Sequence, residues 1–141
     1  MLRKAYLTKQ ITLTVANEVG VLDRVTRYLS ERGINIEAVA GYELGNAQKS
    51  HIMLIVDDTR RATDTLREKD IGPIDENDVI VVELDNKPGA LKSITTLLAQ
   101  KVINIRYIYA TTSPEAAPVR VVVSTSDNEK AAVAVKKAAV K

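Results

Sequence analysis

The sequence repeats itself at a fixed distance of 69 residues. A shift of this size places Gly20 on Gly89 and Leu22 on Leu91, and it also aligns the segment 34–36 with the segment 103–105, both of which read Ile-Asn-Ile. A pattern that occurs twice predicts two similar modules in one chain. Modules this small bury a modest share of their surface, so we expect each to depend on its neighbour or on a second chain. A homodimer or a higher homo-oligomer is therefore expected.

The first copy contains strand and helix patterns in alternation. Apolar residues at every second position predict strands at residues 11–16, 34–40 and 52–56. Between the first two strands, Leu22, Val25 and Leu29 form one apolar helix stripe, with Asn17 as the expected cap and Gly33 as the expected end. A second helix is predicted at 59–69, with Asp57 and Asp58 as capping residues. A short edge strand at 71–74 follows.

The second copy has the same pattern, except at its end. Strands are predicted at 80–84, at 103–109 and, after a loop with Pro114 and Pro118, at 119–123. Leu91, Ile94 and Leu98 form the helix stripe, and Pro88 fits the first helical turn. Ser126 and Glu129 fit a capping box that opens a last helix running to Lys141. No residues are left for a final strand, so we expect either Leu2–Thr8 or an edge of another chain to fill that position.

The order strand, helix, strand, strand, helix, strand is that of ferredoxin-like domains. We therefore predict an α+β protein of two ferredoxin-like βαββαβ modules in tandem, with antiparallel sheets and the helices on one face. The expected divisions are an N-terminal extension (1–9), a first module (10–74), a linker (75–78) and a second module (79–141) that lacks its last strand.

Composition excludes several classes of function. Cysteine is absent, which excludes thiol catalysis, thiolate metal sites and disulfides. The 20 basic and 18 acidic residues are interspersed, so nucleic acid is not an expected partner. No apolar run is long enough to cross a bilayer and no secretory signal is recognised, so we expect no membrane partner and a cytoplasmic protein. No metal site, cofactor or catalytic residue is predicted.

Three residue groups admit a second interpretation. His51 is the only histidine and has no partner ligands at metal-site spacing, which favours a surface strand residue. Asp57 and Asp58 could form an acid/base pair, but helix capping explains them more simply. Tyr107 and Tyr109 lie on one side of a strand, as in proteins that stack RNA bases, although they continue the alternation of the core residues before them.

The loops around Gly20 and Gly89 are better candidates for a site. A chain that turns from strand to helix at glycine gathers unpaired backbone N–H groups, which attract a carboxylate or another anion. Asn17 in the first loop, and Asp85 and Asn86 in the second, could accept hydrogen bonds from an ammonium group. Together these groups suit a zwitterion, while the alternative is that they only cap helices and form tight turns.

The second loop, Asp85-Asn86-Lys87-Pro88-Gly89-Ala90-Leu91, resembles the ACT domain motif when taken with Asn104-Ile105. That motif has an acidic or polar residue shortly before Pro-Gly-x-Leu and an Asn-Ile at the second strand. The first copy is similar, but Val19 stands where proline is usual, so the second loop is the better ligand candidate. The resemblance covers the chain from about Gln10 to its end.

The resemblance implies binding of an amino acid or a similar small effector where the loop of one module faces the second-strand region of another. Carried onto this chain, it implies that the contact residues are Asn17, Glu18, Val19, Gly20, Val21, Leu22, Asn35, Ile36, Asp85, Asn86, Lys87, Pro88, Gly89, Ala90, Leu91, Asn104 and Ile105. Such domains usually regulate an attached or associated enzyme. We therefore expect a free-standing regulatory protein of amino-acid metabolism, with a biosynthetic enzyme as a candidate partner.

Two alternatives are kept. The chain could act purely by protein–protein interaction, as a regulatory subunit whose ligand loops are degenerate. It could also be a small enzyme on the same fold, such as an acylphosphatase-like hydrolase. That reaction needs an arginine and an asparagine placed for phosphate chemistry, and no such pair is evident.

Overall fold

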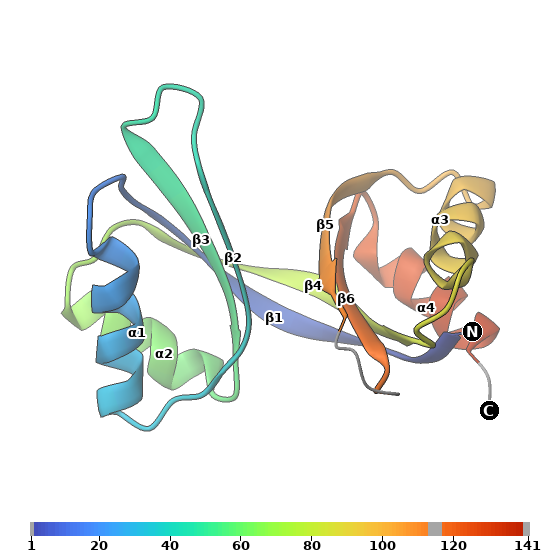
Figure 1. Ribbon diagram of the computed structural model, residues 1–141, viewed down its shortest axis with the longest axis horizontal. Helices are drawn as coiled ribbons and strands as arrows, with labels where there is room; N and C mark the ends of the chain where they lie inside the picture. Colours follow the sequence, from blue (N-terminus) through green and yellow to red (C-terminus); the bar gives the residue numbers. More distant parts are fainter. Residues whose placement is uncertain (1, 113–116, 140–141) are drawn as a thin grey trace. The chain divides into compact units, whose positions relative to one another are not determined.

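The computed structural model of this chain describes residues 2–112 and 117–139 and forms two compact units (Figure 1). The first module is Lys9–Asn77, and the second module is the segment from Asp78 onward together with the chain start up to Thr8. The loop position Pro114 and the expected helix end at Lys141 lie outside the described residues. The domain boundaries that we expected from the sequence stay a prediction.

The first module packs two helices on four strands of a sheet that has six strands in all, of which β1 and β4 are shared with the second module. Its elements are the later part of β1 (Leu2–Ala16), α1 (Val21–Glu31), β2 (Ile36–Glu43), β3 (Lys49–Val56), α2 (Thr59–Glu68) and the start of β4 (Ile74–Leu84). The strands are ordered β2-β3-β1-β4, and β3 is antiparallel to both β1 and β2. Alternate strand residues such as Leu13 and Leu54 are fully buried against Val25 and Leu29 of α1 and Leu66 of α2. The helices thus cover one face of this sheet.

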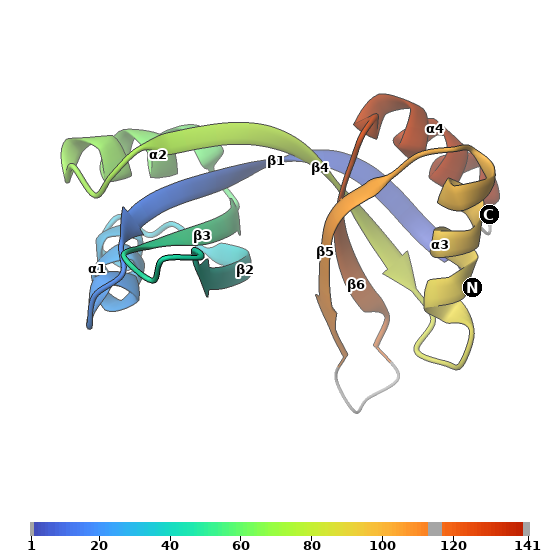
Figure 2. The ribbon, with the colours of Figure 1, turned by 90° about the horizontal axis from the view of Figure 1, so that it is seen from above.

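The second module repeats this arrangement. Its elements are the remainder of β4, α3 (Ala90–Gln100), β5 (Ile105–Thr111), β6 (Val119–Thr125) and α4 (Asn128–Ala138). The strands are ordered β1-β4-β6-β5, and β6 is antiparallel to β4 and β5. Both helices lie on the same side of β5 and β6 (Figure 2). The fold class predicted from the sequence, two tandem ferredoxin-like α+β modules, is confirmed.

The strand that the second copy lacks comes from the start of the chain. Leu2 and Ala5 are buried in the core of the second module, together with residues of β4 and β6. Because β1 lies beside β4 in the sheet, the chain start fills the vacant edge. The first of our two alternatives is therefore confirmed, and strand β1 begins at Leu2 rather than at Ile11.

The expected polar connector at 75–78 is instead part of strand β4. The side chain of Asn77 accepts a hydrogen bond from Thr12 Oγ1 at 3.3 Å, and Thr14 N donates to Pro73 O at 3.0 Å. Pairing with β1 thus continues through this polar segment. Asp75, Glu76 and Asp78 are exposed, so their charge does not prevent this segment from lying beside β1 as a strand.

Several predicted helix starts are wrong. Asn17 and Ser126 do not cap helices, and Pro88 precedes helix α3, which begins at Ala90. The caps of α2 and α4 are Asp58 and Asp127, whose carboxylates each accept from the backbone N–H three residues later at 3.1 Å. Asp58 therefore confirms the capping prediction for the second helix of the first copy.

Two other predictions about side-chain direction are corrected. Leu22 and Leu91 were expected on the buried helix stripe, but they are 46% and 48% exposed. The buried stripe of α3 is Ala90, Ile94 and Leu98, spaced by four residues. Leu91 follows Ala90 by one residue, which is about 100° around the helix axis, so its side chain lies beside the buried stripe rather than on it.

The two tyrosines of β5 are not part of the helix-facing core. A β-bulge between Ile105 and Tyr107 shifts the register, so that Tyr107 and Tyr109 pair with Ser124 and Val122 on the face away from the helices. They are half-buried there. Burial raises the pKa of the Tyr109 hydroxyl above its usual range, with a smaller contribution from Tyr107.

Candidate functional site

Both strand-to-helix loops turn at a glycine with left-handed backbone geometry. Gly20 has φ 88° and Gly89 has φ 85°, a region in which other residues are strained. In the part of the chain that the structure describes, no side chain caps α1 or α3. The first-turn N–H groups of both helices therefore lack a capping side chain, which is the arrangement that attracts an anion.

The first loop uses its polar groups for its own structure. Asn17 Nδ2 donates to Glu43 Oε2 at 2.8 Å and to the backbone oxygen of Ala47 at 2.9 Å, which ties the loop to the β2–β3 hairpin. Glu18 accepts from Arg24 on α1 at 2.6 Å. Val19 is fully exposed. These contacts explain the residues of the first loop without a ligand.

The second loop also pairs charged groups, but its acidic residue binds an arginine of strand β1 rather than one of the following helix. Asp85 follows β4 and accepts a hydrogen bond from the Arg3 guanidinium on β1, which holds the pKa of the Asp85 carboxyl below its usual range. The Nζ atom of Lys87 lies 4.0 Å from Asp85 Oδ2. The Asp85 carboxylate and the Lys87 ammonium group thus lie at the limit of ion-pair distance from each other.

A pocket of about 260 Å³ adjoins the second loop. Three groups of residues line it: the loop, the first turn of α3, and the ends of β4, β5 and β6 that meet there. They are Leu84, Asp85, Asn86, Lys87, Ala90, Leu91, Ala110, Thr111, Thr112, Val119 and Val121. Polar groups thus gather at the loop and aliphatic side chains form the wall, as is typical of small-molecule sites.

Five of the seven residues predicted in the second loop line this pocket, whereas Pro88 and Gly89 do not. Asn104 and Ile105 lie at the far end of β5, where the backbone N–H of Asn104 donates to Ser126 Oγ at 3.0 Å. In the first module, the N–H of Asn35 donates to Asp57 at 3.0 Å, and Ile36 packs against the core. Within one module, the loop and the Asn-Ile segment are therefore not brought together.

The sequence prediction missed the pocket residues at the end of β5 and at the start of β6. Ala110, Thr111 and Val119 reach the loop because β5 and β6 run antiparallel, with Thr111 opposite Arg120 and Leu84 opposite Val119. The predicted fold could have identified these residues. In a ferredoxin-like module, the end of the first strand lies beside the hairpin that joins the second and third strands.

The other residue groups considered from the sequence have the following surroundings in the described residues. They contain no group of three or more histidine and carboxylate side chains that could hold a metal ion. His51 Nδ1 lies 3.2 Å from Thr14 Oγ1, and its ring meets Tyr42 edge-on at 5.5 Å. Over the same residues, every helix is too short or too polar to cross a membrane.

Comparison with known proteins agrees with the duplicated organisation. The family model described as the AHAS small subunit-like ACT domain matches residues 11–69 and again residues 80–140. No curated protein is similar enough in sequence to count as a match.

Solved structures show the same fold. Protein BT0572 from Bacteroides thetaiotaomicron is 26% identical, with a TM-score of 0.86 over 95% of this chain and 90% of that one. The ligand-free regulatory subunit of aspartate kinase from Thermus thermophilus is 18% identical, with a TM-score of 0.67 over 97% of each chain. The corresponding subunit from Thermus flavus is 20% identical, with a TM-score of 0.65 over 97% of each chain.

Proposed function

Because this chain belongs to the family of AHAS small subunit-like ACT domains, we propose that it is a regulatory protein that binds an amino acid at its second loop. It acts on an enzyme of amino-acid metabolism rather than as an enzyme. The observation that carries the proposal is the pocket beside Asp85 and Lys87. Aspartate kinase subunits described as regulatory have the same fold at low identity, which supports the regulatory role by analogy.

The chemistry of the pocket suits an amino acid with an aliphatic side chain. Asp85 is ionised at neutral pH and accepts hydrogen bonds from the ammonium group. Lys87 and the uncapped N-terminal end of α3 attract the carboxylate. Leu91, Ala110 and Val119, which line the pocket and are at least partly exposed, present apolar surface to the side chain of the ligand.

A complete effector site needs a second module. The family resemblance implies contacts from an Asn-Ile segment, and in each module this segment lies away from the loop of the same module. A second module that brings its own segment to the loop completes the site. A ligand that binds the assembled form more tightly than the open form then shifts the population toward assembly. We also propose that the protein is cytoplasmic.

The test is a thermal unfolding screen of the full chain against the common amino acids, with and without substitution of Lys87. A ligand at roughly 100 times its Kd stabilises the folded state by about 2.7 kcal/mol. We expect an aliphatic amino acid to raise the unfolding temperature of the wild type and of Glu18→Ala, which alters the equivalent position of the first loop. We expect Lys87→Ala to respond weakly. A chain that responds to none of the common amino acids at millimolar concentration would contradict the proposal.

The alternative is a subunit that acts by assembly alone. For the first loop this alternative is favoured, because its polar side chains are bonded within the protein. Substitution of Gly89 by valine separates the two functions. If the second loop binds an effector, Gly89→Val loses the ligand response while the oligomer mass is kept. If the loop serves assembly, the oligomer mass falls instead.

A further inference from the structure

The two helices of the second module carry an excess of lysine. Helices α3 and α4 together contain four lysines and a single acidic residue, Glu129. The lysines are Lys92, Lys130, Lys136 and Lys137, and Lys101 follows directly at the end of α3. All are exposed. This outer face of α3 and α4 is therefore positively charged.

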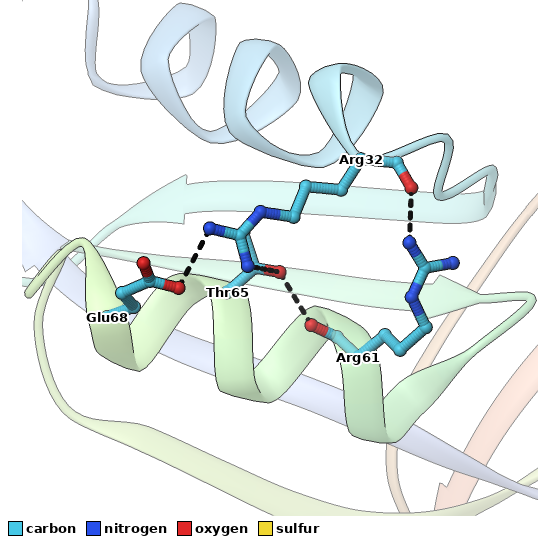
Figure 3. Close-up of polar contacts among 4 residues, drawn as sticks. All are labelled: Arg32, Arg61, Thr65 and Glu68. Carbon is cyan, nitrogen blue, oxygen red and sulfur yellow. Dashed lines mark hydrogen bonds and ion pairs between the residues drawn. The ribbon is translucent and has the colours of Figure 1, made fainter.

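The repeat shows that the fold does not require this charge. Shifted by 69 residues, Lys92 corresponds to Asp23 and Lys137 corresponds to Glu68. In the first module, Asp23 lies 3.6 Å from Arg27, and Glu68 accepts from Arg32 at 2.8 Å (Figure 3). The counterpart of Arg32 is Lys101, so an ion pair in one module is replaced by two cations in the other. The same backbone thus accommodates acids at both positions.

Lys92 is also unfavourably placed for helix stability. It is the third residue of α3, in a first turn that has no acidic residue. The positive end of the helix dipole disfavours a cation there and favours an anion such as Asp23 at the equivalent position of α1. Helix stability therefore does not explain Lys92, whereas an anionic binding partner does.

A groove of about 560 Å³ runs beside this lysine. Its volume is within the range of about 300–1,000 Å³ that is usual for ligand sites. Its lining combines apolar side chains with two hydroxyl groups, one amide and one lysine, and Lys137 precedes the lining residue Ala138 in the sequence. The lining residues are Leu2, Gly89, Lys92, Ser93, Thr96, Leu97, Gln100 and Ala138. None of them lines the pocket of the second loop.

We propose that this groove binds an acidic segment of a partner protein, with carboxylates against Lys92 and Lys137 and an aliphatic side chain against Leu2 and Leu97. Charge complementarity selects the acidic partner. The concave shape favours a peptide over an anionic membrane, since a flat membrane surface would leave the groove unfilled. The inference does not depend on the effector pocket.

The experiment measures binding of a fluorescein-labelled peptide of alternating glutamate and leucine to the full chain at low salt, by fluorescence anisotropy. The test variant is Lys92→Asp with Lys137→Glu, which installs residues of the kind that the first module has at these positions. The control variant is Arg60→Glu with Arg67→Glu on α2, which changes the net charge by the same amount. Vesicles of phosphatidylserine and phosphatidylcholine serve as the competing probe.

We expect the wild type and the control variant to bind the peptide, and the test variant to bind at least about tenfold more weakly. The test variant should keep its circular dichroism spectrum and unfold at the same or a higher temperature, because an aspartate in the first turn of α3 interacts favourably with the helix dipole. Absence of peptide binding by the wild type overturns the proposal. So does equal weakening in both variants, or binding to vesicles without binding to the peptide.

Discussion

The end of the first helix in each module requires a residue with left-handed backbone geometry. Gly33 meets this need in the first module, with φ 68°, and a Cβ atom built there would meet no atom within 4 Å. The equivalent residue of the second module is Val102, with φ 58° and 90% exposure. A β-branched residue is strained in this region, and an exposed one gains little from packing. Val102 is therefore a weak point of the second module.

We predict that Val102→Gly stabilises the chain by about 1 kcal/mol, because the left-handed conformation costs a residue with a Cβ atom roughly 1–2 kcal/mol and part of that gain is offset by the freer unfolded chain. Urea unfolding followed by circular dichroism measures the difference. The matched control is Gly33→Val, which should destabilise by a similar amount through strain alone. If both substitutions leave the unfolding free energy unchanged, strain at these positions is not the explanation.

Helices and strands with strong apolar periodicity could be predicted from the sequence. Features that depend on pairing with a neighbouring strand could not. The helix at 59–69 matches α2 closely, because Ala62 and Leu66 anchor it and Asp58 caps it. The polar part of β4 has no apolar alternation, and its strand conformation goes with its position beside β1 in the sheet. The bulges between Ile36 and Ala38 and between Ile105 and Tyr107 cannot be recognised from the alternation of apolar residues either.

Some residues of the candidate site could likewise be predicted from the sequence, and others could not. The second loop was found from sequence, because its glycine and its neighbours recur at the repeat distance. Thr111, Thr112 and Val119 were missed because they join the loop only through strand pairing, across roughly 20 to 35 residues of chain. Asn104 was assigned to the site from the family resemblance, and within its own module it lies at the other end of β5.

The contact of strand β1 with the second loop makes the stability of the second module dependent on pH. Asp85 has a pKa below the ordinary value of about 3.9, mainly because Arg3 hydrogen-bonds to its carboxylate. A lowered folded-state pKa contributes stability that is complete above the unfolded-state pKa. That contribution is lost as the pH falls through the folded-state pKa.

We therefore predict that Arg3→Gln raises the pKa of Asp85 toward its ordinary value. The variant should be less stable than the wild type at neutral pH, and the difference should shrink as the pH falls below about 4. An NMR titration of the Asp85 carboxyl carbon and urea unfolding across this pH range measure the two effects. Lys4→Gln, one position along β1, is the control and should leave the Asp85 titration unchanged. An unaltered titration in Arg3→Gln would contradict the assignment.

At the scale of the whole molecule, the same surface is left exposed in both modules. β2 ends the sheet of the first module, and β5 ends the sheet of the second. Each edge strand carries one exposed aliphatic residue at the equivalent position, Val39 at 51% and Ile108 at 40%. An unpaired edge with exposed apolar residues is a surface on which another chain can add a strand. Its occurrence in both copies favours assembly through these edges.

We predict that Ile108→Lys weakens the oligomer. The charge of a lysine on an edge strand opposes pairing with a second chain, and the substitution also removes the apolar contact of Ile108. Sedimentation equilibrium over a range of protein concentrations measures the dissociation constant, which we expect to rise at least about tenfold. Val133→Lys on α4 is the control, since Val133 is also exposed, at 53%, but lies on a helix. Two results would contradict edge-mediated assembly: a wild-type chain that stays monomeric at all concentrations, or a control variant that dissociates as readily as Ile108→Lys. If the edge is the interface, the amino-acid response of the second loop should weaken together with the oligomer, because a complete effector site then depends on the module that the second chain supplies.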